Sequence, residues 1–296
     1  MKIDAWITKN ATRLDGKLVA VTGSTGGIGT ELCRHLARLG ADLLLLNRSE
    51  AKSRAQCRAL SDEFPTVRAE YLTVDLENAD SVKAVTEQLK EKNIHVFIHN
   101  AGAYSIPRHR CTDTGFDNVF QINFVSPYYM IRELLPILRQ QNGRAVAVGS
   151  IAHNYSKIDS DDIDFSTYQA ASKVYGNAKR HLMYGLAELF REETNASLAI
   201  THPGITFTNI TAHYPKVIFA MIKHPMKIIF MKPKKAALCV LSGLFEDCDA
   251  HTWIGPRIFD VWGFPKKKAL KTADAEERRR IAKRAETAYE IMKRIG

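Results

Sequence analysis

Short apolar runs alternate with longer segments of helical period through the first two thirds of the chain. In the helical segments, apolar residues recur three and four positions apart, as at Leu32, Leu36 and Leu39. Runs rich in Val, Ile and Leu that alternate with such helices predict a parallel sheet with helices on both faces. The predicted strands are residues 17–23, 42–48, 70–76, 95–102, 144–150 and 197–204. Because no repeat or low-complexity linker divides the 296 residues, we expect a single α/β domain with a doubly wound sheet.

Three segments depart from this alternation. Residues 151–170 are long for a connection between a strand and a helix, which favours a functional loop over a bare connection. Residues 205–232 mix apolar residues with lysines and two prolines. Near the C-terminus a stripe of apolar residues at helical spacing predicts a basic helix over about 272–295 that docks on the domain. The stripe consists of Ile281, Ala285, Ala288, Met292 and Ile295.

The chain is basic, with a formal net charge of +10, and the charge is local. Residues 205–235 carry six lysines and no acidic residue, and residues 265–296 carry eleven Lys and Arg against five acidic residues. Such local charge indicates a surface for anionic partners, with a solvated tail and a solvated helix face as the alternative. The sequence holds no nucleic-acid-binding motif, so we expect no nucleic-acid partner.

The five cysteines are scattered, without a CxxC pair or the spacing of metal ligands. We therefore expect free thiols in a reducing cytoplasm and no metal site. The first ten residues lack the apolar core of a signal peptide, and no uninterrupted apolar run approaches the length of a membrane span. The sequence thus predicts a cytoplasmic protein.

A glycine-rich turn follows the first predicted strand and opens the first helix. It reads TGSTGGIG over residues 22–29, with glycines at 23, 27 and 29. In this position glycines let the backbone approach a pyrophosphate, while the free amides of the helix N-terminus point at it. The turn therefore predicts a Rossmann-like dinucleotide site.

The end of the second strand indicates which dinucleotide is bound. A site for NAD(H) usually has an acidic residue here that binds the ribose 2′-hydroxyl. This chain has Asn47, Arg48 and Ser49 instead. Because a guanidinium pairs with a 2′-phosphate, we expect NADP(H) over NAD(H). The alternative is that Arg48 is an ordinary surface arginine.

Further motifs follow the glycine turn in a fixed order. They are Asp75-Leu76, Asn100-Ala101-Gly102, Asn123, Ser150, a Tyr-x3-Lys pair and Pro203-Gly204. With this series the chain resembles the short-chain dehydrogenase/reductase family over roughly residues 15–265. His99 departs from the family, in which an Asn is common at this position, and the interval between the Ser and the Tyr is longer than usual. That interval resembles the subgroup related to retinol dehydrogenases.

Two Tyr and Lys pairs compete for the role of the active site. Residues four apart share a helix face, whereas residues five apart diverge by about 140°. Tyr175 and Lys179 therefore stack, and Tyr168 and Lys173 point apart. The spacing from Lys179 to Pro203, one helix and one strand, is also the spacing of the family. We assign Tyr175 and Lys179 to the site.

These residue types suit proton transfer to a carbonyl that receives a hydride. A tyrosine is a poor acid or base near neutrality, and a lysine ammonium one turn away, together with an oxidised nicotinamide, is expected to lower its pKa. Ser150 is placed to hydrogen-bond the substrate oxygen. The resemblance implies that Tyr175 is the acid/base, that Lys179 also holds the nicotinamide ribose, and that Asn123 anchors a water in a proton relay.

The glycine turn and the resemblance together give the set of residues expected to bind the cofactor. These are Gly23, Ser24, Thr25, Gly27, Ile28, Gly29, Asn47, Arg48, Ser49, Asp75, Leu76, Asn100, Ala101, Gly102, Tyr175, Lys179, Pro203, Gly204, Thr206 and Thr208.

Residues 205–232 fall where the family builds its substrate lid. The apolar composition of this segment suits a bulky hydrophobic ketone and secondary alcohol, or aldehyde and alcohol, of steroid, retinoid or lipid type. His153, Asn154 and Tyr155 either line the pocket or belong to a solvated loop. We expect an NADP(H)-dependent oxidoreductase; the alternative is a non-enzymatic NADP(H)-binding sensor or scaffold.

Two further expectations concern partners. The mixture of lysines and apolar residues at 205–232 also reads as an interfacial membrane contact, against a plain cytosolic enzyme. The resemblance implies a homodimer that pairs through the helices after the fourth and fifth strands.

Overall fold

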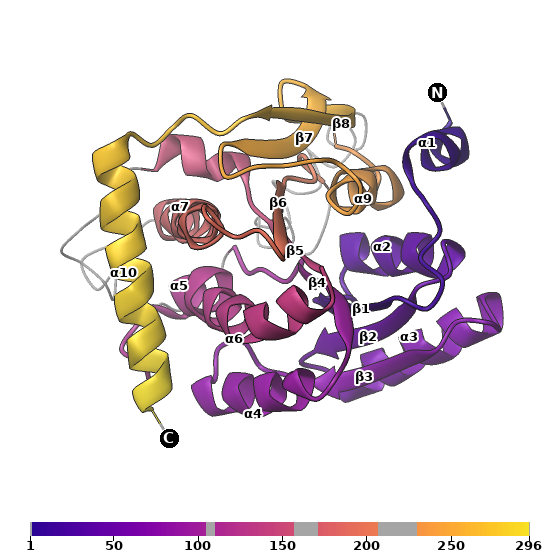
Figure 1. Ribbon diagram of the computed structural model, residues 1–296, viewed down its shortest axis with the longest axis horizontal. Coiled ribbons are helices and arrows are strands. Elements are labelled where there is room, and N and C mark those ends of the chain that lie inside the picture. Colours follow the sequence, from indigo (N-terminus) through magenta and orange to yellow (C-terminus); the bar gives the residue numbers. More distant parts are fainter. Residues whose placement is uncertain (1, 105–109, 157–170, 207–229, 296) are drawn as a thin grey trace, which may run out of the picture.

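Eight strands form one sheet through the centre of the molecule (Figure 1). The structure is a computed structural model that describes residues 2–104, 110–156, 171–206 and 230–295. The strands are β1 (Leu18–Thr22), β2 (Asp42–Asn47), β3 (Ala69–Thr73), β4 (Ile94–His99), β5 (Arg144–Val148), β6 (Ser197–Thr201), β7 (Thr252–Ile258) and β8 (Trp262–Ala269). Their order across the sheet is β3-β2-β1-β4-β5-β6-β7-β8, and the chain reverses direction across the sheet beside β1. This is the doubly wound arrangement, which opens a crevice at the carboxyl ends of β1 and β4.

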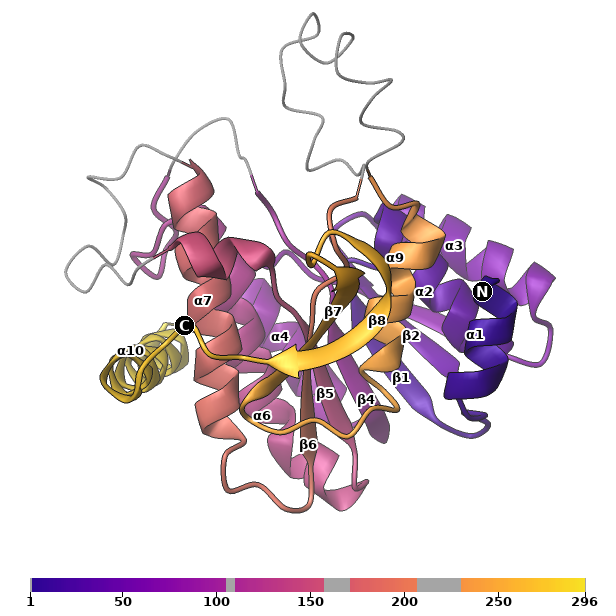
Figure 2. The same cartoon turned by 90° about the horizontal axis from the view of Figure 1, so that it is seen from above.

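Helices cover both faces of the sheet (Figure 2). They are α1 (Ile3–Asn10), α2 (Gly27–Arg38), α3 (Glu50–Glu63), α4 (Ala79–Lys90), α5 (Asn118–Phe120), α6 (Ser126–Gln140), α7 (Ala171–Leu189), α9 (Pro233–Ser242) and α10 (Ala275–Arg294), with a π-helical turn η1 (Gln121–Val125) and a 3-10 turn η2 (Ile151–Tyr155). Side chains of α1, α2, α3 and α9 form one core cluster, and those of α4, α6, α7 and α10 form the other. Alternate residues of a strand point to opposite faces, so Val19 and Val21 enter the first cluster and Ala20 the second.

The six strands that the apolar runs predict are all present, and the hairpin of β7 and β8 extends the sheet beyond them. The strands β1 to β7 run parallel to one another, whereas β8 is antiparallel to β7. β8 reads WGFPKKKA, and a proline and three lysines suit an exposed edge strand rather than a buried apolar run. This composition explains why the strand carries no apolar signal in the sequence.

The C-terminal helix α10 packs along α7 and α6 (Figure 1). Its apolar stripe is buried: Ile281, Ala285, Ala288, Tyr289 and Met292. A Cβ built on Gly185 of α7 would lie 3.5 Å from the Cβ of Ala285, so the two helices approach closely at this point. α10 thereby covers faces of the two helices that follow β4 and β5.

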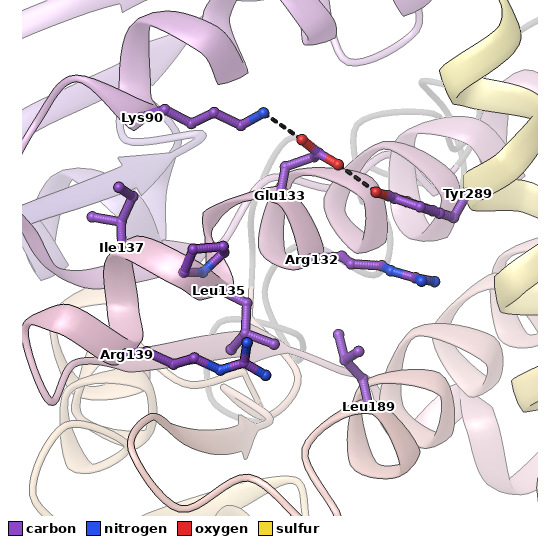
Figure 3. A pocket seen from close by; sticks show the side chains of 9 residues that line it. Lys90, Arg132, Glu133, Leu135, Ile137, Arg139, Leu189 and Tyr289 are labelled. Atoms are coloured by element: carbon purple, nitrogen blue, oxygen red, sulfur yellow. Dashed lines mark hydrogen bonds and ion pairs between the residues drawn. The ribbon is translucent and has the colours of Figure 1, made fainter.

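Polar contacts add to this packing at the far end of α10. Glu133 of α6 accepts hydrogen bonds from Lys90 of α4 and from the hydroxyl of Tyr289 (Figure 3). The guanidinium of Arg132 lies 3.8 Å from the centre of the Tyr289 ring. These contacts border a cavity of about 540 Å³ between the helices. Within the described part of the chain, no helix is both long and apolar enough to cross a membrane.

We expect Ile281→Ala to lower the free energy of unfolding by about 2–5 kcal/mol, because it removes a fully buried side chain and leaves a cavity between α10 and α7. Urea unfolding followed by circular dichroism measures the change. Arg280→Ala, at an exposed position of the same helix, is the control and is expected to change little. Equal effects of the two substitutions would show that α10 does not dock through its stripe.

Candidate active site

The glycine turn runs directly against the end of β4. Gly23 has a φ of +64°, and a Cβ at this position would lie 2.7 Å from the Cα of Ala101. A Cβ on Gly29 would lie 2.3 Å from the carbonyl oxygen of Gly23. The side-chain amide of Asn100 donates to the carbonyl oxygens of Thr22 and Gly23 at 3.2 and 3.0 Å. Only glycine fits such an approach, which holds the turn open toward a ligand.

Asn47 and Ser24 shape the turn from within. Asn47 is buried, its Oδ1 accepts from the backbone N–H of Thr25 at 3.2 Å, and its Nδ2 donates to the hydroxyls of Ser24 and Ser53. Ser24 is buried as well and donates to Oε1 of Gln56 at 3.1 Å. The hydrogen bonds of these two side chains are therefore internal. In a cofactor site, Asn47 and Ser24 would stabilise the glycine turn.

A cavity of about 410 Å³ opens over the turn. It is lined by the backbone of the turn, by Asp75 and Leu76 after β3, and by the segment Asn100–Gly102 after β4. Arg48 lies exposed at the same cavity, as does Lys52 from the first turn of α3. Ser49 caps α3 by accepting from the backbone N–H of Lys52. Sequence reasoning missed Lys52, for which the signal was a second cation four residues after Arg48.

A second cavity, of about 500 Å³, adjoins the first, and Ile28, Asn100 and Gly102 line both. Ser150, Tyr175 and Lys179 meet in its wall. Ser150 follows β5, its Oγ accepts from the N–H of Ala152, and its side chain is hydrogen-bonded to Tyr175. Pro203, Gly204 and Thr206 after β6 close the other side of the cavity.

The two lysines of α7 have different surroundings. Lys179 is buried, its Nζ donates to the carbonyl oxygen of Val148 at 2.8 Å, and the same Nζ lies 5.8 Å from the centre of the Tyr175 ring. Lys173 is exposed at the rim of the second cavity. Tyr168 lies outside the described residues. Tyr175 and Lys179 thus share a face of α7, as their spacing predicts.

Asn123 lies in the π-helical turn η1, opposite Lys179. Its Nδ2 donates to the carbonyl oxygens of Val119 and Ala103 at 2.8 and 2.7 Å. In an α-helix, the Val119 carbonyl would accept the backbone N–H of Asn123, so the side chain takes over an acceptor of the helix at this irregular turn. The buried Oδ1 of Asn123 has no hydrogen-bond partner among the described residues. It is therefore available to a small polar ligand such as a water.

Burial shifts the pKa of both central groups toward the neutral form. It raises the pKa of Tyr175 to about 12, with the hydrogen bond to Ser150 acting in the opposite direction. It lowers the pKa of Lys179 to about 7. The expectation of a lowered pKa at Tyr175 combined the charge of Lys179 with that of an oxidised nicotinamide. In the chain alone, the loss of solvent outweighs the hydrogen bond to Ser150 and raises the pKa of Tyr175.

Two residues near Tyr175, Tyr104 and Gly176, carried no recognised signal in the sequence. The ring of Tyr104 packs edge-on against that of Tyr175 with 5.1 Å between centroids. Gly176 lets η2 approach α7, since a Cβ there would lie 3.0 Å from the carbonyl oxygen of Ala152 and 1.9 Å from Oγ of Ser156. Helical periodicity in the sequence does not predict the role of such a glycine, because that role depends on a neighbour from another element.

The remaining expectations concern residues 153–155, the lid segment and a metal site. His153 is buried and bonded to the carbonyl oxygen of Ser150, whereas Tyr155 is exposed at the second cavity. Asn154 is exposed as well. Thr208 and most of the lid expected at 205–232 lie outside the described residues. Of the residues that the structure describes, no group of three or more His, Cys, Asp or Glu is arranged to hold a metal ion.

A doubly wound sheet with a glycine turn at its crevice defines a Rossmann-type dinucleotide-binding protein. The model of the short chain dehydrogenase family matches residues 17–216. The chain belongs to this family of NAD(P)(H)-dependent oxidoreductases.

Its relatives include retinol dehydrogenase 12 of Mus musculus, 29% identical over 204 residues, which cover 67% of this chain and 64% of that protein. Polyprenol dehydrogenase of Homo sapiens is 27% identical over 208 residues, covering 67% and 63%. The matches therefore span a little under two thirds of these two relatives.

Solved structures share the fold. An uncharacterized protein from Mycobacterium paratuberculosis superimposes with a TM-score of 0.77 at 22% identity, covering 94% of this chain and 95% of that chain. A short-chain dehydrogenase from Sphingobium yanoikuyae, solved in complex with NADPH, has a TM-score of 0.55 at 26% identity and covers 66% and 74%.

The lowered pKa of Lys179 predicts how stability depends on pH. Between about pH 7 and 10, unfolding takes up a proton on this lysine, because the unfolded chain holds it up to its ordinary pKa. The free energy of unfolding of the native protein should therefore rise with pH relative to Lys179→Met, by up to about 1.4 kcal/mol per pH unit. The raised pKa of Tyr175 acts in the opposite direction only above about pH 10.

Urea unfolding at several pH values between 7 and 10 measures this difference. Lys173→Met makes the same replacement at an exposed position of α7 and is expected to follow the native protein. Parallel curves for the native protein and Lys179→Met would contradict the neutral, buried amine.

Proposed function

We propose that the protein is an NADP(H)-dependent oxidoreductase that interconverts a hydrophobic ketone or aldehyde with its alcohol, with Tyr175 as the acid/base. The observation that carries this proposal is the meeting of Ser150, Tyr175 and Lys179 in the wall of the 500 Å³ cavity, next to the cavity over the glycine turn. A module that only binds a nucleotide has no use for a proton donor at this position.

The residues of the site divide the work as follows. Bound NADP(H) supplies or accepts the hydride. The hydroxyl groups of Ser150 and Tyr175 hydrogen-bond the substrate oxygen, and Tyr175 gives its proton to that oxygen in reduction or takes it in oxidation. Lys179, with its pKa near neutrality, holds the ribose and exchanges a proton with solvent through a water on Asn123 Oδ1.

The preference for NADP(H) over NAD(H) is supported by charge. Arg48 and Lys52 are both exposed at the cavity over the glycine turn, where a 2′-phosphate would lie between two cations. Neither cation forms an ion pair with an acidic group of the described residues. The NADPH complex of the Sphingobium yanoikuyae relative supports the same choice.

The substrate class follows from the cavity and from the relatives. Tyr104, Ile151, Tyr155 and Ile205 give the 500 Å³ cavity a largely apolar lining. The volume suits a small hydrophobic ligand of steroid or retinoid size. Retinol and polyprenol, the alcohols in the names of two relatives, are of this chemical kind. A lid at 205–232 and a cytoplasmic location remain predictions.

A homodimer also remains a prediction, and the structure limits how it forms. The resemblance places pairing on the helices after the fourth and fifth strands, α6 and α7. Because α10 packs on these two helices, a dimer of this chain needs a surface that α10 leaves free.

Tyr175→Phe tests the catalytic assignment. The variant keeps the ring that packs on Tyr104 and loses only the hydroxyl group, so turnover should fall by about 10²-fold or more while NADPH binding is retained. NADPH consumption with a panel of hydrophobic ketones and aldehydes measures turnover, and fluorescence titration measures binding. Equal turnover in both proteins would end the assignment; NADPH binding by a native protein without turnover on any substrate would favour a sensor or scaffold.

Arg48→Ala tests the cofactor preference. It should weaken NADPH binding about tenfold or more and NADH binding far less, because only the former carries the 2′-phosphate. Arg58→Ala removes an exposed arginine from α3 away from the cavity and serves as the control. Similar losses for both nucleotides in Arg48→Ala would refute the contact with the 2′-phosphate.

A further inference from the structure

Exposed apolar side chains gather at the tip of the β7–β8 hairpin. Among the residues that the structure describes, five large hydrophobic side chains are exposed, and Tyr155 is the one away from this tip. The other four are Ile205 at 37%, Ile258 at 45%, Phe259 at 87% and Trp262 at 44%. Ile258 and Trp262 pair across the hairpin, and the N–H of Ile205 donates to the carbonyl oxygen of Val261. We call these four residues the hairpin patch.

The backbone conformation at Phe259 and Asp260, in the turn at the centre of the patch, favours smaller residues than phenylalanine. Phe259 and Asp260 have φ values of +49° and +58°, and the N–H of Val261 donates to the carbonyl oxygen of Ile258 across them. Turns with two successive positive φ values favour Asn and Gly, and a bulky residue there is strained. The chain thus keeps its most exposed aromatic side chain at a position where stability alone would select a small polar residue. Such a conflict points to a function outside the fold.

Basic side chains surround the patch. Lys235 of α9 lies 3.8 Å above the ring of Trp262. Arg257 precedes the turn and is exposed, and exposed Lys232 follows Met231, whose N–H bonds the carbonyl oxygen of Ile205. The nearby acidic residue, Asp260, is neutralised by an ion pair with Lys268 at 2.6 Å. The patch is therefore aromatic and apolar at its centre and positive around it.

The patch adjoins the 500 Å³ cavity. Gly204 and Ile205 line this cavity, and a Cβ on Gly204 would lie 2.7 Å from the carbonyl oxygen of Val261 in the turn. β7, β8 and the start of α9 lie side by side in both views (Figures 1 and 2). A surface that binds through the patch would therefore lie next to the cavity.

We propose that the hairpin patch docks on the surface of an anionic lipid bilayer. Tryptophan and phenylalanine enter the boundary between headgroups and acyl chains, and lysine and arginine attract anionic headgroups. A second copy of the chain fits this surface less well, because pairing through it would bring the basic side chains around the two patches close together. The proposal concerns described residues only, and of the segment 205–232 it uses Ile205 and Lys232.

Intrinsic fluorescence provides a direct test with the full chain. The protein has three tryptophans, of which Trp6 and Trp253 are buried and Trp262 is exposed. Vesicles made of equal parts phosphatidylserine and phosphatidylcholine should shift the emission to shorter wavelength as Trp262 enters the lipid. Vesicles of phosphatidylcholine alone should give a much smaller shift, and added salt should weaken binding to the anionic vesicles. Flotation with the vesicles measures binding independently.

Two variants separate the parts of the patch. Phe259→Asn removes the aromatic ring and introduces a residue that tolerates positive φ, so the variant should be at least as stable as the native protein while binding anionic vesicles about tenfold or more weakly. Lys232→Glu reverses a charge at the N-terminus of α9, where a carboxylate suits the helix dipole, and should also weaken binding about tenfold. Arg279→Glu makes the same charge change on exposed α10 and should have a small effect.

Several results would overturn the proposal. No binding of the native protein to anionic vesicles, or unchanged binding by Phe259→Asn, would exclude the patch as a lipid surface and leave it to a protein partner. A larger loss with Arg279→Glu than with Lys232→Glu would move the contact to α10. None of these measurements needs turnover, so a failure of the proposed enzymatic function leaves the test intact.

Discussion

The hydrogen bond from Nζ of Lys179 to the carbonyl oxygen of Val148 joins the helix that carries Tyr175 to the strand that leads into Ser150. A buried amine without such an acceptor would be costly, so this contact fixes the position of α7 relative to the end of β5. Gly176 completes the arrangement, because the absence of a Cβ lets η2 lie against α7 directly after Ser150. The shape of the second cavity and the contact between Ser150 and Tyr175 both depend on this junction.

Much of the architecture could be predicted because buried parallel strands leave a strong apolar signal. β1, β2 and β4 to β6 consist mainly of buried apolar residues, whereas the edge strand β3 reads AEYLT and is not buried. Residues that directly follow the buried strands, such as Ser150 and Asn100, necessarily reach the same edge of the sheet. The spacing of Tyr175 and Lys179 also predicted that their side chains share one face of α7. These features are local in sequence, so the pattern of the chain contains them.

Features that depend on neighbours from distant segments could not be predicted in the same way. Asn47 carries the residue type of a ligand contact, yet its partners are the hydroxyls of Ser24 and Ser53. Tyr104 meets Tyr175 across 71 positions of the chain, and no spacing rule links them. The pKa of Tyr175 is raised in the chain alone because burial, which the sequence does not state, outweighs the hydrogen bond to Ser150. β8 was hidden because an edge strand with lysines has no apolar run.

The burial that raises the pKa of Tyr175 and lowers the pKa of Lys179 also suits the site to acid/base chemistry. A lysine with a pKa near 7 is divided between its two protonation states at neutral pH, so a modest change in the charge around it shifts the balance. A tyrosine with a pKa of about 12 keeps its proton until a stronger base develops beside it, and a carbonyl oxygen that receives a hydride becomes such a base. The cavity therefore holds a proton donor that is inactive alone and a neighbouring amine that responds to small electrostatic changes. A polar, solvated setting would keep the lysine charged at all neutral pH values and remove that sensitivity, which is why the dry junction between β5 and α7 matters to function as well as to packing.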